Sequence, residues 1–266
     1  MALACAAPAC AAPPADCLGP AGMAGAAVQN AVSLHAMTFS PFGHIEIGWE
    51  TYLPAVQHEI GSACPAGTPG FAAALSRWQA RARLAPTGVM DADAFQAVKA
   101  AIQTRRPFAI QSRRICPAPP TPDMLVAGAA AEGYGGKSVV LRPGALDAYR
   151  RMVREARATS PAIRADSRNL TIFSSFRSPD YDAARCLRDN NCDGVRRATC
   201  SPHRTGDALD LYLGAAPGYG PDSTADPSRL YLSQTPTYRW LVTNAARFGF
   251  VNYLYEPWHW EWAEER

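Results

Sequence analysis

Four side chains near the C-terminal end of the sequence have the types and spacing of a catalytic metal centre. His203 and Asp210 lie seven residues apart, and Glu256 precedes His259 by three residues. Two imidazoles and one carboxylate form a typical ligand set for catalytic zinc, which keeps a further position open for water. A hydrolytic site also needs a carboxylate that is not a ligand, because a base must take the proton from that water. The sequence therefore predicts a zinc hydrolase.

The stretch 208–213 reads as a strand that presents Asp210 to a cleft. Side chains alternate between the two faces of a strand, so its three leucines point one way and Asp210 points the other way. The leucines are expected in the core. His203 would fall on the wrong face of one continuous strand, so the chain must turn between the two residues. Gly206 can supply that turn, because glycine adopts backbone angles that other residues avoid.

Glu256 and His259 would diverge if both lay on one strand, whereas a single 3₁₀-like turn places them on the same side. Pro257 favours a break in the strand at this point, because it cannot donate to a β-ladder. Trp258 and Trp260 are then expected to pack around the site. Ordinary core packing is an equally good interpretation of both tryptophans.

Three separated motifs occur in the order that one family uses. They are the arginine motif Ser174-Ser-Phe-Arg177-Ser-Pro, then Ser201-x-His203-x-x-Gly206-x-Ala208-x-Asp210, and finally Glu256-x-Trp258-His259. Through these motifs, residues 140 to 262 resemble the zinc D-Ala-D-Ala carboxypeptidases, the VanY-like peptidases of the M15 group. One departure concerns Asp182, which follows Tyr181 where the family often has glutamine, and it leaves the fine substrate preference open.

The resemblance implies a role for each of these residues. It implies zinc bound by His203, Asp210 and His259, with Glu256 as catalytic base. Arg177 would bind substrate and stabilise the charge that develops during the reaction. Ser201 and Trp258 are further candidates for substrate contacts, although Ser201 could instead support the loop or a ligand through a hydrogen bond.

The implied activity is removal of the terminal D-Ala from peptidoglycan stem peptides. Cleavage elsewhere in the stem, by an endopeptidase or a D-Ala-D-Ala dipeptidase, uses the same metal chemistry and stays open. A non-catalytic peptidoglycan-binding protein with a structural zinc is the alternative from another class. Glu256 argues against it, because a binding protein has no use for a carboxylate that is not a ligand.

The fold class predicted for residues 125–266 is α+β. Helical patterns cover 144–159, 181–188 and 237–248, and strand patterns cover 170–174, 208–213 and 251–255. Such a mixture favours a small, mainly antiparallel sheet with flanking helices. We expect this region to be the zinc peptidase domain, and the proline-rich residues 106–124 to be a linker.

Residues 44–105 are predicted to form a small three-helix domain. Helical spacing covers 49–60 and 71–84, and Asp91 is a candidate N-cap for a third helix. The pattern resembles the peptidoglycan-binding domain found beside many cell-wall hydrolases, in the residues Phe71, Leu75, Trp78, Gln79, Pro86 to Val89 and Phe95. A generic helical bundle that braces the catalytic domain is the alternative. Because the proposed catalytic residues all lie from Arg177 onward, this domain is expected to bind polymer and to add nothing to the chemistry.

Composition limits the cellular setting and the partners. The formal net charge of +3 is mild, which argues against a nucleic-acid partner, and no long apolar run predicts a transmembrane helix. Eight cysteines without a CxxC pair indicate disulfides in an oxidising compartment, with their pairing open. We therefore expect a secreted monomer in the periplasm or cell envelope. Residues 1–43 are rich in alanine and proline, and are expected to be a disordered leader or a signal remnant.

Overall fold

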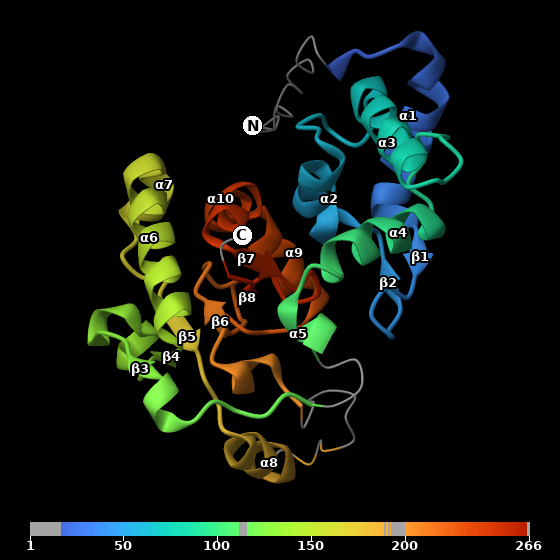
Figure 1. Ribbon diagram of the computed structural model, residues 1–266. Coiled ribbons are helices and arrows are strands. Elements are labelled where there is room, and N and C mark those ends of the chain that lie inside the picture. The colour runs from blue at the N-terminus through green and yellow to red at the C-terminus, as the bar shows by residue number, and fades with distance from the viewer. Residues whose placement is uncertain (1–16, 112–115, 189, 191, 193–199, 265–266) are drawn as a thin grey trace, which may run out of the picture.

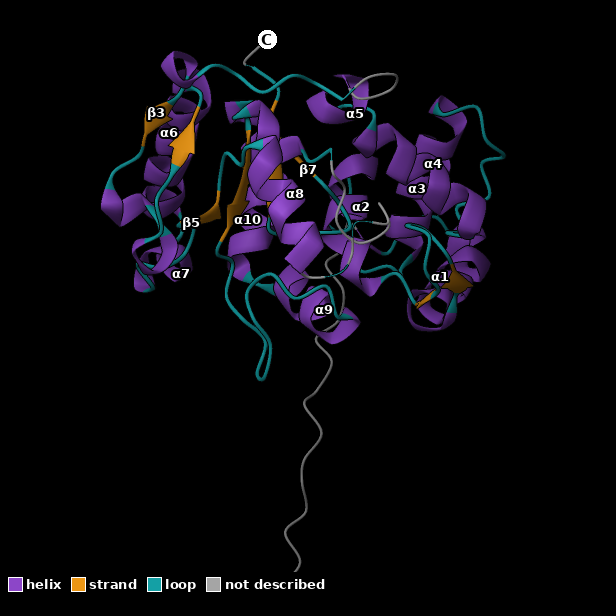
Figure 2. Cartoon of the chain, turned by 90° about the horizontal axis from the view of Figure 1, so that it is seen from below, coloured by secondary structure: helices purple, strands orange, loops and turns teal. Residues whose placement is uncertain are grey.

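The computed structural model describes residues 17–111, 116–188, 190, 192 and 200–264. Helices and strands mix in an α+β arrangement, as predicted. Figures 1 and 2 show the same order across the molecule, from α6 and α7, through the main sheet with α9 and α10, to the group α1–α4. The sheet that carries the predicted site therefore lies between two groups of helices.

The secondary-structure elements have the following bounds. The helices are α1 Ala24–Ala36, α2 Leu53–Ile60, α3 Pro69–Arg81, α4 Ala92–Gln103, α5 Pro107–Gln111, α6 Pro143–Thr159, α7 Pro161–Ala165, α8 Pro179–Arg188, α9 Asp226–Gln234 and α10 Pro236–Asn244. The strands are β1 Thr38–Phe39, β2 Glu46–Ile47, β3 Val126–Ala127, β4 Val140–Leu141, β5 Ile172–Ser174, β6 Ala208–Leu211, β7 Phe250–Asn252 and β8 His259–Trp262. The 3₁₀ helices used below are η3 Glu50–Tyr52, η7 Pro202–Thr205 and η8 Ala245–Phe248.

Some of the helices begin where a side chain bonds a free N–H group of the first turn, among them α3, α4, α7 and α10. Asp91 accepts a hydrogen bond from the backbone N–H of Ala94 at 2.8 Å and so starts α4, as predicted. Thr68 accepts from the N–H of Phe71 at the start of α3 in the same way. The strand predicted over 251–255 is shorter in the structure, because β7 ends at Asn252 and a turn follows.

The main sheet has the strand order β5-β6-β8-β7 with every neighbouring pair antiparallel. In the β6–β8 pair, Asp210 lies opposite His259 and Ala208 lies opposite Glu261. The strand β8 was not predicted from the sequence, although it is an inner strand of the sheet. This register brings two distant motifs side by side.

Two hydrophobic clusters divide the described residues. One cluster draws its members from residues 139–260, around the sheet, α6 and α10. The other draws its members from residues 17–98, and Leu254 of the C-terminal region is buried with them. Residues 17–106 contain this second cluster and α1–α4, and we call them the first unit. Contacts of α9 with η3, of α10 with α2 and of α4 with β7 join the two units.

The prediction that residues 1–43 form a disordered leader is wrong for residues 17–43. Residues 24–36 form α1, which packs against α3. The fully buried Asn30 donates to the carbonyl of Gly88 and accepts from the N–H of Met90, at 2.8 and 2.7 Å. Cys17 is joined to Cys64. An alanine-rich helix can pack closely, so low charge did not indicate disorder here. Residues 1–16 lie outside the described residues.

The predicted disulfides are present in the structure. The pairs are Cys17–Cys64, Cys116–Cys200 and Cys186–Cys192. Cys5 and Cys10 lie outside the described residues. The bridge from Cys116 fastens the predicted linker to the loop before the metal motif, and α5 shows that the linker region also contains a helical turn.

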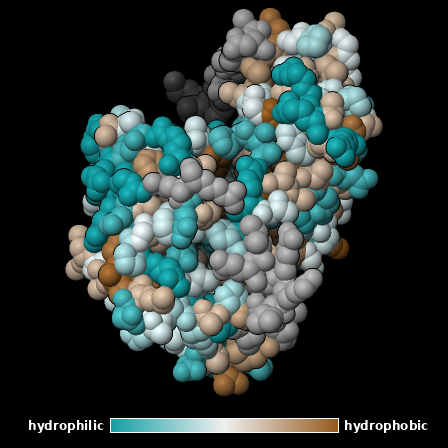
Figure 3. Space-filling view, in the orientation of Figure 1, coloured by the Kyte–Doolittle hydropathy of each residue, from teal (hydrophilic) through white to brown (hydrophobic). Residues whose placement is uncertain are grey.

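None of the described helices has the length and apolar character needed to cross a membrane. In Figure 3, hydrophobic residues are scattered over the visible face among hydrophilic ones.

Replacing Asn30 should lower the urea concentration at which the first unit unfolds. Asn30→Ala removes the side chain that bonds two backbone groups of a buried loop. The carbonyl of Gly88 and the N–H of Met90 then remain unpaired. We expect the free energy of unfolding to fall by about 2–4 kcal/mol. Urea titration followed by tryptophan fluorescence measures this, with the exposed neighbour Gln29→Ala as the matched control. Equal stability of the two variants would contradict the assignment of α1 to the folded unit.

Candidate metal and active site

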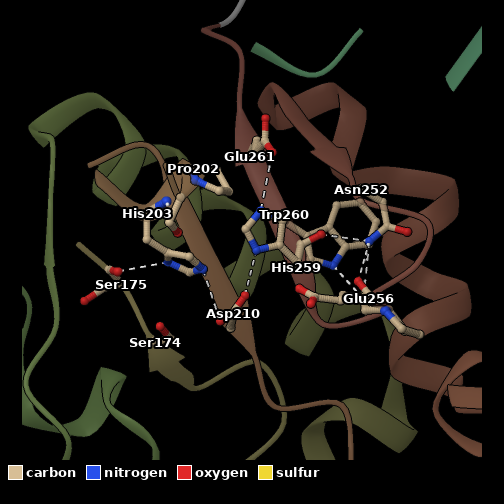
Figure 4. Close-up of polar contacts among 12 residues, drawn as sticks. Ser174, Ser175, Pro202, His203, Asp210, Asn252, Glu256, His259, Trp260 and Glu261 are labelled. Carbon is tan, nitrogen blue, oxygen red and sulfur yellow. Dashed lines mark hydrogen bonds and ion pairs between the residues drawn. The ribbon is translucent and has the colours of Figure 1, made fainter. Parts of the chain in front are cut away.

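The two histidines and Asp210 meet at the centre of the sheet. Asp210 faces His259 across the β6–β8 pair, and its Oδ1 lies 2.8 Å from Nδ1 of His259. The Oδ2 of Asp210 lies 3.2 Å from Nε2 of His203. All three residues are buried. Figure 4 shows the two rings on either side of the carboxylate.

His203 reaches Asp210 through the predicted turn. The 3₁₀ helix η7 contains His203 and ends at Thr205, and the next residue, Gly206, caps it with a left-handed φ of 78°. A Cβ at this position would come within 2.9 Å of the end of the Leu125 side chain, which can move aside, so the left-handed backbone is what favours glycine here. At the other end, Ser201 accepts a hydrogen bond from the N–H of His203.

The remaining nitrogen of each ring has a partner of its own. Nδ1 of His203 lies 2.9 Å from the carbonyl oxygen of Ser175, and Nε2 of His259 lies 3.4 Å from Oε1 of Glu261. Such partners fix the ring orientation and leave the other nitrogen as the ligand atom. The ligand atoms of His203, Asp210 and His259 all lie within 4.8 Å of one another. This donor set fits a metal ion that accepts nitrogen and oxygen ligands.

Glu261 is a site residue that the sequence reasoning missed. His259 and Glu261 are two residues apart on β8, so they share a face of the sheet, while Trp260 lies on the other face. The alternation of polar and aromatic residues in the stretch 259–262 was the signal that could have found it. Ala208 lies opposite Glu261 and leaves room for its side chain.

The electrostatics of the cluster favour a positive charge between the carboxylates. Burial opposes charge on His259, but the hydrogen bonds and charges of Asp210 and Glu261 outweigh it and raise the pKa of His259 to about 9. Burial likewise disfavours ionised Asp210, yet the two histidines hold the pKa of Asp210 below its ordinary value. Burial lowers the pKa of His203, which favours the neutral ring that metals bind. The same carboxylates that hold a proton here would hold a cation.

Glu256 stands beside His259 because of one turn. The N–H of His259 donates to the carbonyl of Glu256 at 2.9 Å, which is the predicted 3₁₀-type turn. In Figure 4, the side chains of Glu256 and Asp210 lie on the same side of the His259 ring. Burial raises the pKa of Glu256, and the charge of Asp210 adds to this, while that of His259 opposes it. A raised pKa makes the carboxylate a stronger base.

Arg177 lies in a cavity next to this cluster. The cavity has a volume of about 690 Å³, and its lining includes Lys137, Arg177 and Asp210. The Arg177 guanidinium is held by Asp182, Ser174 and Ser201, at 2.8, 2.6 and 2.9 Å. A guanidinium carries five N–H groups, so hydrogens remain for a ligand in the cavity.

Two predicted substrate contacts have different places in the structure. Ser201 accepts hydrogen bonds from Arg177 and from the backbone N–H of His203, so it holds these two residues in position. Trp258 is 3% exposed and belongs to the hydrophobic cluster of the sheet. Because its ring packs in the core, we correct its assignment as a substrate contact. Asp182 pairs with Arg177, which places the family departure directly beside the predicted substrate-binding arginine.

A second group of metal-ligand side chains, His44, Glu46 and Asp226, is a weaker candidate. Both oxygens of Glu46 already bond the hydroxyl of Tyr52, and the buried Arg229 pairs with the same carboxylate. An arginine within the group opposes a second cation.

Comparison with known proteins gives two findings. Residues 139–265 match the family model of VanY, D-alanyl-D-alanine carboxypeptidase. A solved structure described as "Structure of the LdcB LD-carboxypeptidase reveals the molecular basis of peptidoglycan recognition" is similar to this chain, with 20% sequence identity and a TM-score of 0.40. The similarity covers 56% of this chain and 72% of that chain. None of the curated proteins matches this chain.

Removing any one ligand should empty the metal site. His203→Ala, Asp210→Ala and His259→Ala each take away one of three donors, so we expect each variant to lose tightly bound divalent metal. Elemental analysis after dialysis measures the metal content. His44→Ala, from the weaker group, is the matched control and should retain the metal. Full occupancy in the three site variants would show that the ligands lie elsewhere.

Proposed function

We propose that this chain is a zinc-dependent D-alanyl-D-alanine carboxypeptidase, because residues 139–265 match the VanY family model. Its substrate would be the peptidoglycan stem peptide, from which it removes the terminal D-Ala. The observation that carries the proposal is the buried group of His203, Asp210 and His259, with Glu256 beside it, next to the cavity that Arg177 lines.

Zinc is the proposed metal because of the donor set. Two imidazoles and one carboxylate suit zinc, and a three-ligand site keeps a position for water or substrate. When bound, zinc would supply Lewis acidity that activates water and polarises the scissile carbonyl. His203 and His259 would hold it through the ring nitrogens that face Asp210, with the other nitrogens fixed by Ser175 and Glu261.

Glu256 is the proposed general base and general acid. It is not in the group of ligand atoms, and the pKa of its half-buried carboxylate is raised. It would accept the proton of the attacking water and then pass it to the amine of the departing D-Ala. Positioned proton transfer of this kind contributes about 10²- to 10⁴-fold to a rate.

Arg177 is proposed to bind the free carboxylate at the end of the substrate. The cavity lining contains Lys137, Arg177, Arg185 and Arg188, against Asp210 and Asp222 among the acids. Positive lining favours a peptide that ends in a carboxylate, and a guanidinium binds a carboxylate through two parallel hydrogen bonds. This charge supports a carboxypeptidase over an endopeptidase, whose substrate has no terminal carboxylate at the bond that is cut. A D-Ala-D-Ala dipeptidase stays an alternative, since its substrate also carries that carboxylate.

The first unit is proposed to bind the cell-wall polymer, as its resemblance to a peptidoglycan-binding domain suggests. A binding unit raises the local concentration of an insoluble substrate. The three disulfides among the described residues and the proposed substrate support a secreted protein of the periplasm or cell envelope. We propose that it acts as a monomer. A non-catalytic binding protein with structural zinc is disfavoured by the half-buried Glu256 beside the ligands, which no structural site requires.

Glu256→Gln should separate catalysis from metal binding. The amide keeps the size of the side chain but cannot take a proton, so turnover should fall by about 10²-fold or more while zinc stays bound. Mass spectrometry of products from a soluble pentapeptide ending in D-Ala-D-Ala measures turnover, and elemental analysis measures zinc. The exposed Glu264→Gln is the control. Turnover by Glu256→Gln near that of the wild type would remove Glu256 from the mechanism.

A substrate with an amidated C-terminus should test the role of Arg177. Losing a charged hydrogen-bonding partner costs about 1.5–3 kcal/mol, so kcat/KM should fall by about 10- to 100-fold for the amide. Arg177→Met should lower kcat/KM for the acid peptide by a similar factor and leave the amide almost unaffected. Arg168→Met, an exposed arginine paired with Asp166, is the control. An enzyme that cuts acid and amide equally well would be an endopeptidase.

A further inference from the structure

One arginine of the helical region reaches the metal site from outside the peptidase domain. Arg106 follows α4, which belongs to the first unit, and its side chain is buried against β8. Its Nε donates to Oε1 of Glu261 at 2.9 Å, and its Nη2 donates to the same oxygen. The N–H of Phe108 donates to the other oxygen of Glu261 at 3.0 Å. Both carboxylate oxygens of Glu261 are therefore bonded by the segment that follows α4.

Glu261 is the residue that fixes the ring of His259. Oε1, the oxygen that Arg106 holds, lies 3.4 Å from Nε2 of His259. Glu261 is 2% exposed, so water does not compete for it. The orientation of the His259 ring thus depends on a carboxylate whose own position depends on Arg106.

The first unit also holds the segment that leads to Glu256. The Arg106 guanidinium lies 4.1 Å from the centre of the Tyr253 ring, which packs edge-on against His259. Gln103 donates to the carbonyl of Asn252, and Leu254 is buried in the cluster of the first unit. Consecutive residues before the proposed base are therefore fixed by residues from another unit.

We propose that Arg106 is a positioning residue of the metal site, and that the first unit completes the catalytic centre in addition to any role in polymer binding. The proposal rests on the proposed function only in requiring that His259 binds a metal ion. Arg106 acts through Glu261, which holds the His259 ring so that Nδ1 faces the ion. Without the guanidinium, a buried carboxylate loses its cation and no longer has one fixed position.

Arg106→Met should weaken zinc binding. Loss of a partner that orients a ligand typically costs about 10- to 100-fold in metal affinity, and we expect a rise of this size in the Kd for zinc. Competition with a chromophoric chelator measures the Kd without any need for turnover. Cobalt substitution gives a second readout, since a change in the visible spectrum reports an altered ligand geometry.

Arg105→Met is the matched control. Arg105 is the adjacent arginine of the same unit and also pairs with a glutamate, Glu59, but that partner belongs to the first unit. We expect this variant to keep the wild-type Kd and cobalt spectrum. If the first unit affected the metal site only through the overall stability of the fold, Arg106→Met and Arg105→Met would change the Kd for zinc equally.

A double-mutant cycle with Glu261→Gln decides whether Arg106 acts through Glu261. If it does, Arg106→Met adds no further loss of affinity in the Glu261→Gln background, and the double variant, free of a buried unpaired charge, folds even where Arg106→Met alone does not. The proposal would be overturned if the rise in Kd for the double variant equalled the product of the rises for the two single variants. Equal Kd values for Arg106→Met and Arg105→Met would overturn it as well. A wild-type protein that binds no zinc would instead overturn the proposed function.

Discussion

The site depends on the register between β6 and β8. Asp210 and His259 lie directly opposite each other in this pair. A shift of one residue would turn the whole face of a strand to the other side, because side chains alternate. His259 and Glu261 would then point into the core, and Trp260 would take their place. The leucines of β6 and the tryptophans of β8 fix the register by burial, so the hydrophobic core determines where the ligands meet.

The second constraint is that the charges at this site are buried. Carboxylates are costly to bury unless cations and N–H groups surround them. Four short strands cannot supply all these partners. The structure takes them from distant segments: the carbonyl of Ser175 on His203, and Arg106 with the N–H of Phe108 on Glu261. Segments remote in sequence are therefore needed to satisfy the charges of the ligands.

The ligand motifs could be predicted from the sequence because the chemistry itself dictates residue types and short spacings. The alternation in β6, the left-handed Gly206 and the turn at Pro257 are all local features, and the structure has each of them. The pairing of Arg106 with Glu261 could not be predicted in this way, since 155 residues separate the two partners. Helix α1 was missed for a similar reason. The buried role of Asn30 depends on the loop at Gly88, which no local pattern identifies.

The contact at Glu261 also changes what the division into units means. An expectation that the first unit adds only polymer binding follows from the positions of the catalytic residues in the sequence. However, arginine is the residue whose planar fork can place two N–H groups on one carboxylate, and here that fork comes from the first unit. Lysine would offer charge without that geometry. Glu261 also bonds His259, so one carboxylate contacts both the first unit and a proposed metal ligand. The two units therefore share one set of buried charges, and neither can satisfy that set alone.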